Sequence, residues 1–330
     1  MHREINHIII ITMKPNKRQI SDSLLRMLDV GGQYHVITEI VKSDPYLDME
    51  MRGNTGVIIY YRGGKLLTIN EKNGLIALDK KYCKGDESLY ITPHIDDIFT
   101  YISAAKSVMD CYELTTSKLG EKEIQQRVVY ENNLSVNAEN TDYFIVDVEW
   151  ADNNQLGGRA DIVAFRWDHT IPSHRKRSIQ LTMIEVKQGE KAIETTMTTD
   201  KKGHIKIKPG LRKHYEDYLQ LIRDKEYVQF FVNDMIVVLK QKYSLGLING
   251  LDNLFFQKEK PVQPTLIPDI DFFFLLANYH YYSSLLLREC KSLPDDCKFC
   301  TSSFMGYGLY KDFIFTKKEM KELFPKVFEK

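Results

Sequence analysis

Short apolar runs bounded by turn residues mark two parts of the chain as β-sheet regions. Near the N-terminus, three such runs are separated by Gly-Gly and Asn-Gly dipeptides: residues 57–61, 66–69 and 75–78. Glycine and asparagine allow the positive φ that tight hairpin turns need, so these runs predict an antiparallel β-meander. Three further runs in the middle of the chain have connections short enough to predict a second antiparallel set: residues 143–150, 160–167 and 179–187.

Apolar residues at helical spacing predict helices around these strands. The expected helices cover residues 20–28, 95–112, 121–132, 211–222, 228–243 and 281–290. Two more strands are expected at residues 272–276 and 299–305, and residues 194–203 are expected to form a polar, mobile insert. The predicted fold class is therefore α+β. A smaller N-terminal domain for recognition or assembly (residues 1–114) precedes a second domain (residues 115–330).

Composition narrows the class of protein. Lysine plus arginine and aspartate plus glutamate both number 45, so the formal net charge is zero. A strongly basic chain would indicate nucleic-acid binding by itself, whereas here only local basic patches can serve that role. No segment reaches transmembrane length, and the apolar run at residues 8–11 is too short for a signal peptide. We therefore expect a soluble cytoplasmic protein without a membrane partner.

The five cysteines are an odd number at irregular spacing, which argues against a disulfide scaffold. Cys297 and Cys300 form a C-x-x-C pair, with Cys290 and His280 upstream. A zinc-dependent interaction module built on these four residues is one interpretation. The other interpretation is a set of reduced, partly buried thiols.

Charged residues interrupt the apolar strands in the middle of the chain. Asp161 introduces the second strand, while Glu185 and Lys187 alternate with apolar residues in the third. Side chains at i and i+2 of a strand share a face, so Glu185 and Lys187 point the same way and Val186 points into a core. Two carboxylates and an ammonium on one sheet surface can hold a divalent cation and activate water. The competing interpretation is a buried salt bridge in an inactive protein, although desolvation makes such pairs costly.

From residue 121 the expected order is helix, three antiparallel strands, helices, strand, helix and strand. With Ala160-Asp161 and Glu185-Val186-Lys187 in the second and third strands, this order resembles the PD-(D/E)XK nuclease superfamily. The resemblance covers roughly residues 117–305, and Ala160 stands where the family has proline. It implies a restriction-endonuclease-like αβββαβ fold, in which a mixed sheet is flanked by helices.

The resemblance also implies roles for individual residues. Asp161, Glu185 and the Val186 carbonyl would hold Mg²⁺, with Mn²⁺ as an alternative, and Lys187 would orient or deprotonate the attacking water. Glu121 would fill the place of an extra acid, as a ligand of a second metal or of a water. Its alternative role is to favour the helix N-terminus, where acids interact well with the helix dipole.

Basic residues flank the motif and are expected to contact phosphates. The candidate nucleic-acid contacts are Arg175, Lys176, Arg177, Lys208, Arg212, Lys213, His214 and Tyr218. The expected function is a Mg²⁺-dependent nuclease, with DNA favoured over RNA as the partner and a homodimer compatible with cutting both strands. The alternative is an inactive nucleic-acid-binding or assembly protein with the same fold.

Overall fold

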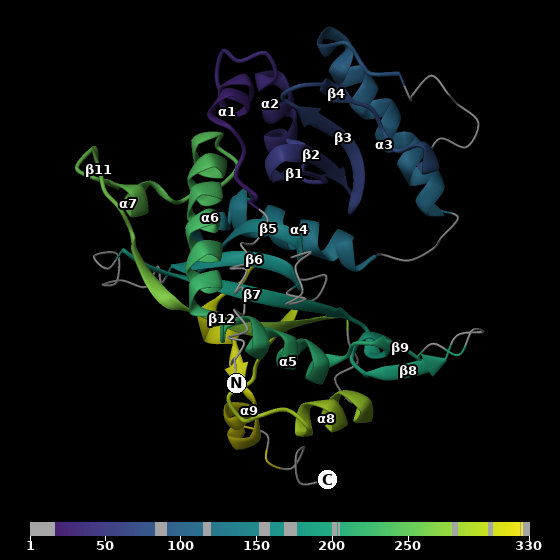
Figure 1. Cartoon of the computed structure of the whole chain (residues 1–330), viewed down its shortest axis with the longest axis vertical. Coiled ribbons are helices and arrows are strands. Elements are labelled where there is room, and N and C mark those ends of the chain that lie inside the picture. Colours follow the sequence, from purple (N-terminus) through teal and green to yellow (C-terminus); the bar gives the residue numbers. More distant parts are fainter. Residues whose placement is uncertain are drawn as a thin grey trace, which may run out of the picture.

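The computed structural model describes residues 17–82, 91–114, 120–151, 159–167, 177–199, 203, 205–278, 283–302, 306–323 and 325. Over these residues the protein is a mixed α+β structure with two main sheets, one above the other in Figure 1. The predicted α+β class is therefore confirmed. Within the same ranges, every helix falls short of the length and apolarity that crossing a bilayer requires.

The larger sheet has six strands in the order β14-β13-β12-β7-β6-β5. Its strands are β5 (Tyr143–Ala151), β6 (Arg159–Trp167), β7 (Ser178–Gln188), β12 (Thr265–Ala277), β13 (Lys298–Ser302) and β14 (Phe315–Thr316). β5, β6 and β7 pair antiparallel, as predicted, whereas β12 runs parallel to β7 and β13 runs parallel to β12. β14 closes the edge antiparallel to β13.

Helices cover both faces of this sheet (Figure 1). On one face lies α4 (Glu121–Asn133), whose Ile124 and Val128 pack with Ile162 and Ile184. The other face is covered by α5 (Leu211–Leu221) and α6 (Lys225–Ser244). There the rings of Trp150 on β5 and Phe231 on α6 lie 4.3 Å apart between centroids, and both side chains are fully buried.

The smaller sheet is a four-stranded antiparallel meander in the order β1-β2-β3-β4. It comprises β1 (Leu47–Met51), β2 (Val57–Tyr61), β3 (Gly64–Asn70) and β4 (Gly74–Ile76), with α1 (Asp22–Leu28), α2 (His35–Ser43) and α3 (Ile98–Leu114) around it. The predicted hairpins between β2, β3 and β4 are confirmed. β1 and α2 were not predicted. The sequence of β1 has a polar pattern because it contains Asp48 and Glu50, although both side chains are buried.

Shorter elements complete the fold. They are β8 (Thr196–Thr199), β9 (Ile205–Lys208), α7 (Asp252–Phe255), β10 (Phe256–Gln257), β11 (Lys260–Pro261), α8 (Ser284–Lys291) and α9 (Lys317–Leu323). Single 3₁₀ turns occur at Gly53–Thr55, Lys80–Tyr82, Ile95–Asp97, Ala138–Asn140, Glu190–Ala192 and Lys311–Phe313. The polar insert expected at residues 194–203 contains β8, which pairs antiparallel with β9, a regular hairpin that was not predicted. Its alternation of threonine and lysine with Met197, Ile205 and Ile207 is a strand pattern of period two.

The two sheets share one apolar core and a buried set of charges. Lys242 on α6 lies 2.6 Å from Glu50 on β1, and both side chains are almost completely excluded from solvent. Arg52, which follows β1, pairs with Asp147 on β5, and Arg18 reaches the same carboxylate at 2.9 Å. The N-terminal sheet is thereby fixed to α6 and to β5, the strand beside the β6–β7 hairpin.

Candidate functional site

The β6–β7 hairpin brings Asp161 and Glu185 together. The strand register runs from Trp167 opposite Ile179 to Ile162 opposite Ile184, and one further step places Asp161 opposite Glu185. The Val186 N–H donates a hydrogen bond of 2.7 Å to Asp161 Oδ2. The pairing expected from the sequence is therefore present, since strand register sets it independently of the connecting loop.

Two further side chains contact Glu185: Lys187 from the same strand and His214 from α5. Lys187 Nζ lies 2.5 Å from Glu185 Oε1 and 3.2 Å from His214 Nε2. His214 Nδ1 lies 3.1 Å from the same Glu185 oxygen. Burial, reinforced by the charge of Lys187, lowers the pKa of His214 to about 3. A neutral ring with its proton on Nδ1 can donate to Glu185 and accept from Lys187 at Nε2, so one tautomer satisfies both contacts.

The carboxylates of the site are electrostatically coupled, and Asp161 also forms a side-chain hydrogen bond with Glu185. Burial raises the pKa of Asp161 well above its ordinary value, and the charges of Glu185 and Glu121 raise it further. Burial likewise raises the pKa of Glu185, against the opposing effect of Lys187. Glu121, the first residue of α4, also raises the pKa of Glu185, so the helix places its carboxylate within electrostatic reach of both strand acids.

The carboxylate oxygens of the site are the type of ligand that a hard divalent cation prefers. Mg²⁺ is typically bound by one or two carboxylates together with water and substrate phosphate. In the conformation described, however, Glu185 Oε1 already contacts Lys187 and His214, and Asp161 Oδ2 accepts from Val186. Val186, expected to offer its carbonyl, thus enters the site through its N–H. Accordingly, the described part of the chain contains no group of three His, Cys, Asp or Glu side chains arranged to hold a metal.

Three of the expected nucleic-acid contacts on α5 have partners within the protein. Arg212 pairs with Glu216 at 3.0 Å, and Lys213 pairs with Asp217. Exposed pairs of this kind, four residues apart on a helix, are weak enough for a phosphate to displace the acid. The Tyr218 hydroxyl donates to the Ile270 carbonyl at 2.9 Å, which turns this ring toward β12.

Four of the remaining expected contacts are not among the residues of α5. Arg177 donates to the carbonyls of Asn253 and Phe256, at 3.0 and 3.3 Å. Lys208 is on β9, with its side chain outside the described structure, and Arg175 and Lys176 lie wholly outside the described residues. His214, the fourth expected contact on α5, contacts Glu185 and Lys187 directly.

The cysteines form no metal cluster within the described residues. Cys290, Cys297 and Cys300 are buried free thiols. Burial raises the pKa of Cys290 and of Cys297 to about 12 and that of Cys300 to about 11. Such thiols stay protonated, whereas zinc requires thiolates. His280, the fourth expected ligand, lies outside the described residues.

Comparisons of the chain with models of protein families, with curated proteins and with solved structures returned no match.

Proposed function

We propose that this protein is a metal-dependent nuclease that hydrolyses phosphodiester bonds, with DNA favoured over RNA. The observation that carries the proposal is an excess of negative charge at one end of a buried hairpin. Glu121, Asp161 and Glu185 stand against the ammonium of Lys187, so the four groups carry a net charge of −2 when all are ionised. A divalent cation would balance this charge.

The chain topology supports a restriction-endonuclease-like fold for the proposed enzyme. α4 is followed by the antiparallel strands β5, β6 and β7, then by α5 and α6, and then by β12. β12 lies beside β7 and runs parallel to it. This arrangement corresponds to the αβββαβ order that the motif in β6 and β7 implies, and the candidate site lies on the second and third strands of that order.

Each residue of the site has a task in the proposed reaction. A bound Mg²⁺ or Mn²⁺ would polarise the phosphate and lower the pKa of water. Asp161 and Glu185 would hold the ion, and Glu121 would orient a water or a second ion. Lys187 would orient the nucleophile and offset charge that develops on the phosphate oxygens. His214 would hold Lys187 in place.

The direct test is cleavage of plasmid DNA and of an RNA transcript with Mg²⁺, Mn²⁺ or EDTA. We expect cleavage that requires the divalent ion and falls by a factor of about 100 to 1,000 in Lys187→Met or Asp161→Asn. Lys240→Met is a matched control, because Lys240 is partly exposed and pairs only with Gln263 among the hydrogen bonds described. Cleavage that persists in EDTA, or in both site variants, would refute the proposal.

A second candidate function is nucleic-acid binding without hydrolysis. The observation that favours it is the closed contact among Glu185, Lys187 and His214, which satisfies the buried charges without an ion. This candidate predicts that the protein binds labelled DNA in a filter assay but cleaves none with either ion. It also predicts that Glu185→Gln leaves binding unchanged.

A further inference from the structure

Glu149 on β5 adopts a backbone conformation that is unusual for its residue type. Its φ is +52°, in the left-handed region that L side chains rarely adopt. The register pairs Val148 with Ile162 and Trp150 with Ala160, so Glu149 stands opposite Asp161. The regular alternation expected for this strand is interrupted here: Val148 packs on the α4 side, and Trp150 packs on the α6 side.

The Glu149 carboxylate is fixed to the beginning of α4. Its Oε1 accepts a hydrogen bond of 3.0 Å from Gln125 Nε2, and its Oε2 lies 3.0 Å from Lys122 Nζ. Lys122 and Gln125 come one and four residues after Glu121. A single side chain of the main sheet thus holds the turn of helix that carries Glu121.

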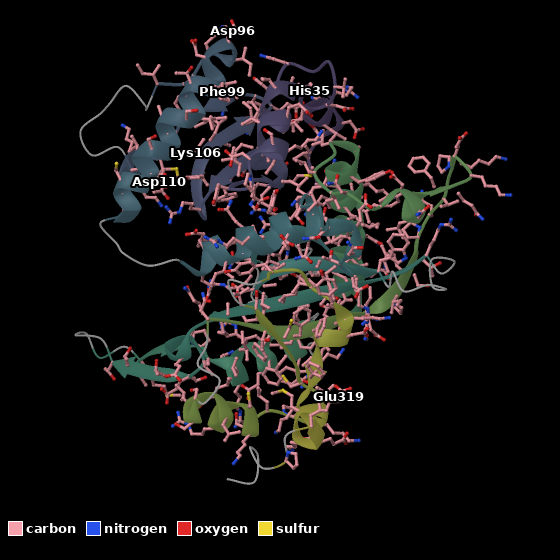
Figure 2. All side chains as sticks on the ribbon, turned by 180° about the vertical axis from the view of Figure 1, so that it is seen from behind. His35, Asp96, Phe99, Lys106, Asp110 and Glu319 are labelled. Atoms are coloured by element: carbon pink, nitrogen blue, oxygen red, sulfur yellow. The ribbon has the colours of Figure 1, made fainter. Side chains whose placement is uncertain are left out.

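A second strained residue holds the same helix from the N-terminal sheet. Arg62 and Gly63 form the β2–β3 turn with φ of +48° and +76°. Arg62 Nη2 lies 3.3 Å from Glu123 on α4, and its Nη1 donates to Asp110, labelled on α3 in Figure 2, at 2.9 Å. The Gly63 N–H donates to the Gln126 side chain.

The β2–β3 turn packs directly against α4, which lies between the two sheets in Figure 1. A Cβ built on Gly63 would lie only 2.3 Å from the Cβ of Lys122, so no larger residue fits there without displacing the helix. At the Arg62 position of such a turn, asparagine or glycine adopts positive φ with less strain than arginine. The strain is therefore not required by the turn itself.

Backbone strain that the surrounding structure maintains is concentrated at functional sites. Five non-glycine residues among those described have positive φ, and two of them, Arg62 and Glu149, contact the first two turns of α4 from different sheets. We infer that Arg62 and Glu149 are positioning residues that fix the start of α4 and hold Glu121 against Asp161 and Glu185. The inference rests on the proposed function, and it makes the N-terminal sheet a support of the active site.

The test uses substitutions that relieve the backbone strain while removing the contact. Arg62→Asn creates the Asn-Gly pair that this turn prefers, and Glu149→Asn keeps a residue that tolerates positive φ but cannot reach Gln125 or Lys122. Lys258→Asn is a matched control, because Lys258 has a φ of 47° in the β10–β11 turn and makes no described contact with α4. All three are compared in the wild-type and Glu121→Gln backgrounds.

We expect the melting temperatures of Arg62→Asn and Glu149→Asn to stay at or above that of the wild type. Amide hydrogen exchange of residues 123–126 should become at least about tenfold faster in both variants and stay unchanged in Lys258→Asn. The Mg²⁺ concentration for half-maximal cleavage should rise about tenfold, and kcat should fall by up to about 100-fold. In the Glu121→Gln background, the same substitutions should have no further effect on cleavage.

Unchanged exchange at residues 123–126 would overturn the inference whether or not the protein cleaves DNA. Equal losses of cleavage in the wild-type and Glu121→Gln backgrounds would also overturn it, because the residues would then act independently of Glu121. A wild type that cleaves nothing, together with faster exchange in both variants, would refute the proposed nuclease. The support of α4 by both sheets would then stand, and its catalytic role would be refuted.

Discussion

The buried pair of Lys242 and Glu50 offers a test of how the two sheets are held together. Lys242→Met keeps the length and apolar stem of the side chain but removes the ammonium that lies 2.6 Å from Glu50. Arg52, at 3.5 Å, is the nearest remaining cation described for Glu50 and also serves Asp147. The substitution therefore leaves a buried carboxylate with incomplete compensation.

Removing one partner of a buried ion pair typically costs about 3–5 kcal/mol, because the other charge stays desolvated. That is a large part of the roughly 5–15 kcal/mol that stabilises an ordinary protein. Replacing both partners, in Lys242→Met with Glu50→Gln, removes the uncompensated charge. The double variant should therefore recover at least about half of the loss.

The loss in Lys242→Met should depend on pH. Burial raises the pKa of Glu50 well above 4.5, and Lys242 exerts the strongest opposing effect, so its removal raises that pKa further. A carboxyl that binds its proton more tightly in the folded than in the unfolded state destabilises the fold above its folded pKa. This contribution disappears as the pH falls through the folded pKa toward the ordinary value. Stability lost at about pH 8 should thus be partly regained at about pH 5.

Urea unfolding followed by circular dichroism at several pH values measures these effects. We expect a fall in the free energy of unfolding of about 3–5 kcal/mol at the higher pH, with a smaller fall at the lower one. A loss below about 1 kcal/mol, or a double variant no more stable than the single one, would refute this account of the interface.

Three further predictions concern separate parts of the molecule. Asp161→Asn should raise the free energy of unfolding by about 1 kcal/mol, because it removes charge repulsion from Glu185 but keeps an acceptor for Val186, while cleavage falls by the factor of about 100 to 1,000 expected above; a lower melting temperature would contradict this. Trp150→Ala should lower the free energy of unfolding, measured by urea titration, by about 3–5 kcal/mol, because it leaves a cavity beside Phe231. A loss below about 1 kcal/mol would contradict the packing of these two rings. Among the described cysteines, a thiol reagent should modify exposed Cys111 first, and Cys111→Ser should remove that fast phase. If the reagent modified the buried thiols of Cys290, Cys297 and Cys300 equally fast, that result would contradict their burial.

Much of the fold could be predicted because its elements have clear periods. The strands of the main sheet near the site and the hairpins of the N-terminal meander follow apolar runs with glycine at the turns. β1 could not be predicted, because Asp48 and Glu50 are charged yet buried against partners far away in the sequence, among them Lys242. The β8–β9 hairpin was missed for a different reason, since threonine-rich strands resemble a loop in composition.

The candidate site was predictable where it depends on local spacing. Glu185 and Lys187 share a strand face by alternation alone, and their pairing with Asp161 follows from hairpin register. The contacts of His214 depend on how α5 packs over that hairpin, so no local pattern revealed them. The strain at Glu149 likewise arises from tertiary structure, because glutamate carries no sequence signal for positive φ.

The two sets of buried charges in this protein differ in their balance, and the difference bears on their roles. At the interface of the sheets, three cations face three buried acids. Arg18 and Arg52 contact Asp147, and Lys242 contacts Glu50, while Asp48 lies within electrostatic reach of Lys242 and Arg52. Removing a cation there should destabilise the fold. At the β6–β7 hairpin, three carboxylates stand against Lys187, and neutralising Asp161 should stabilise the fold instead. Opposite signs for Lys242→Met and Asp161→Asn would show that the hairpin retains charge at a cost to folding, as a site that binds a divalent ion must.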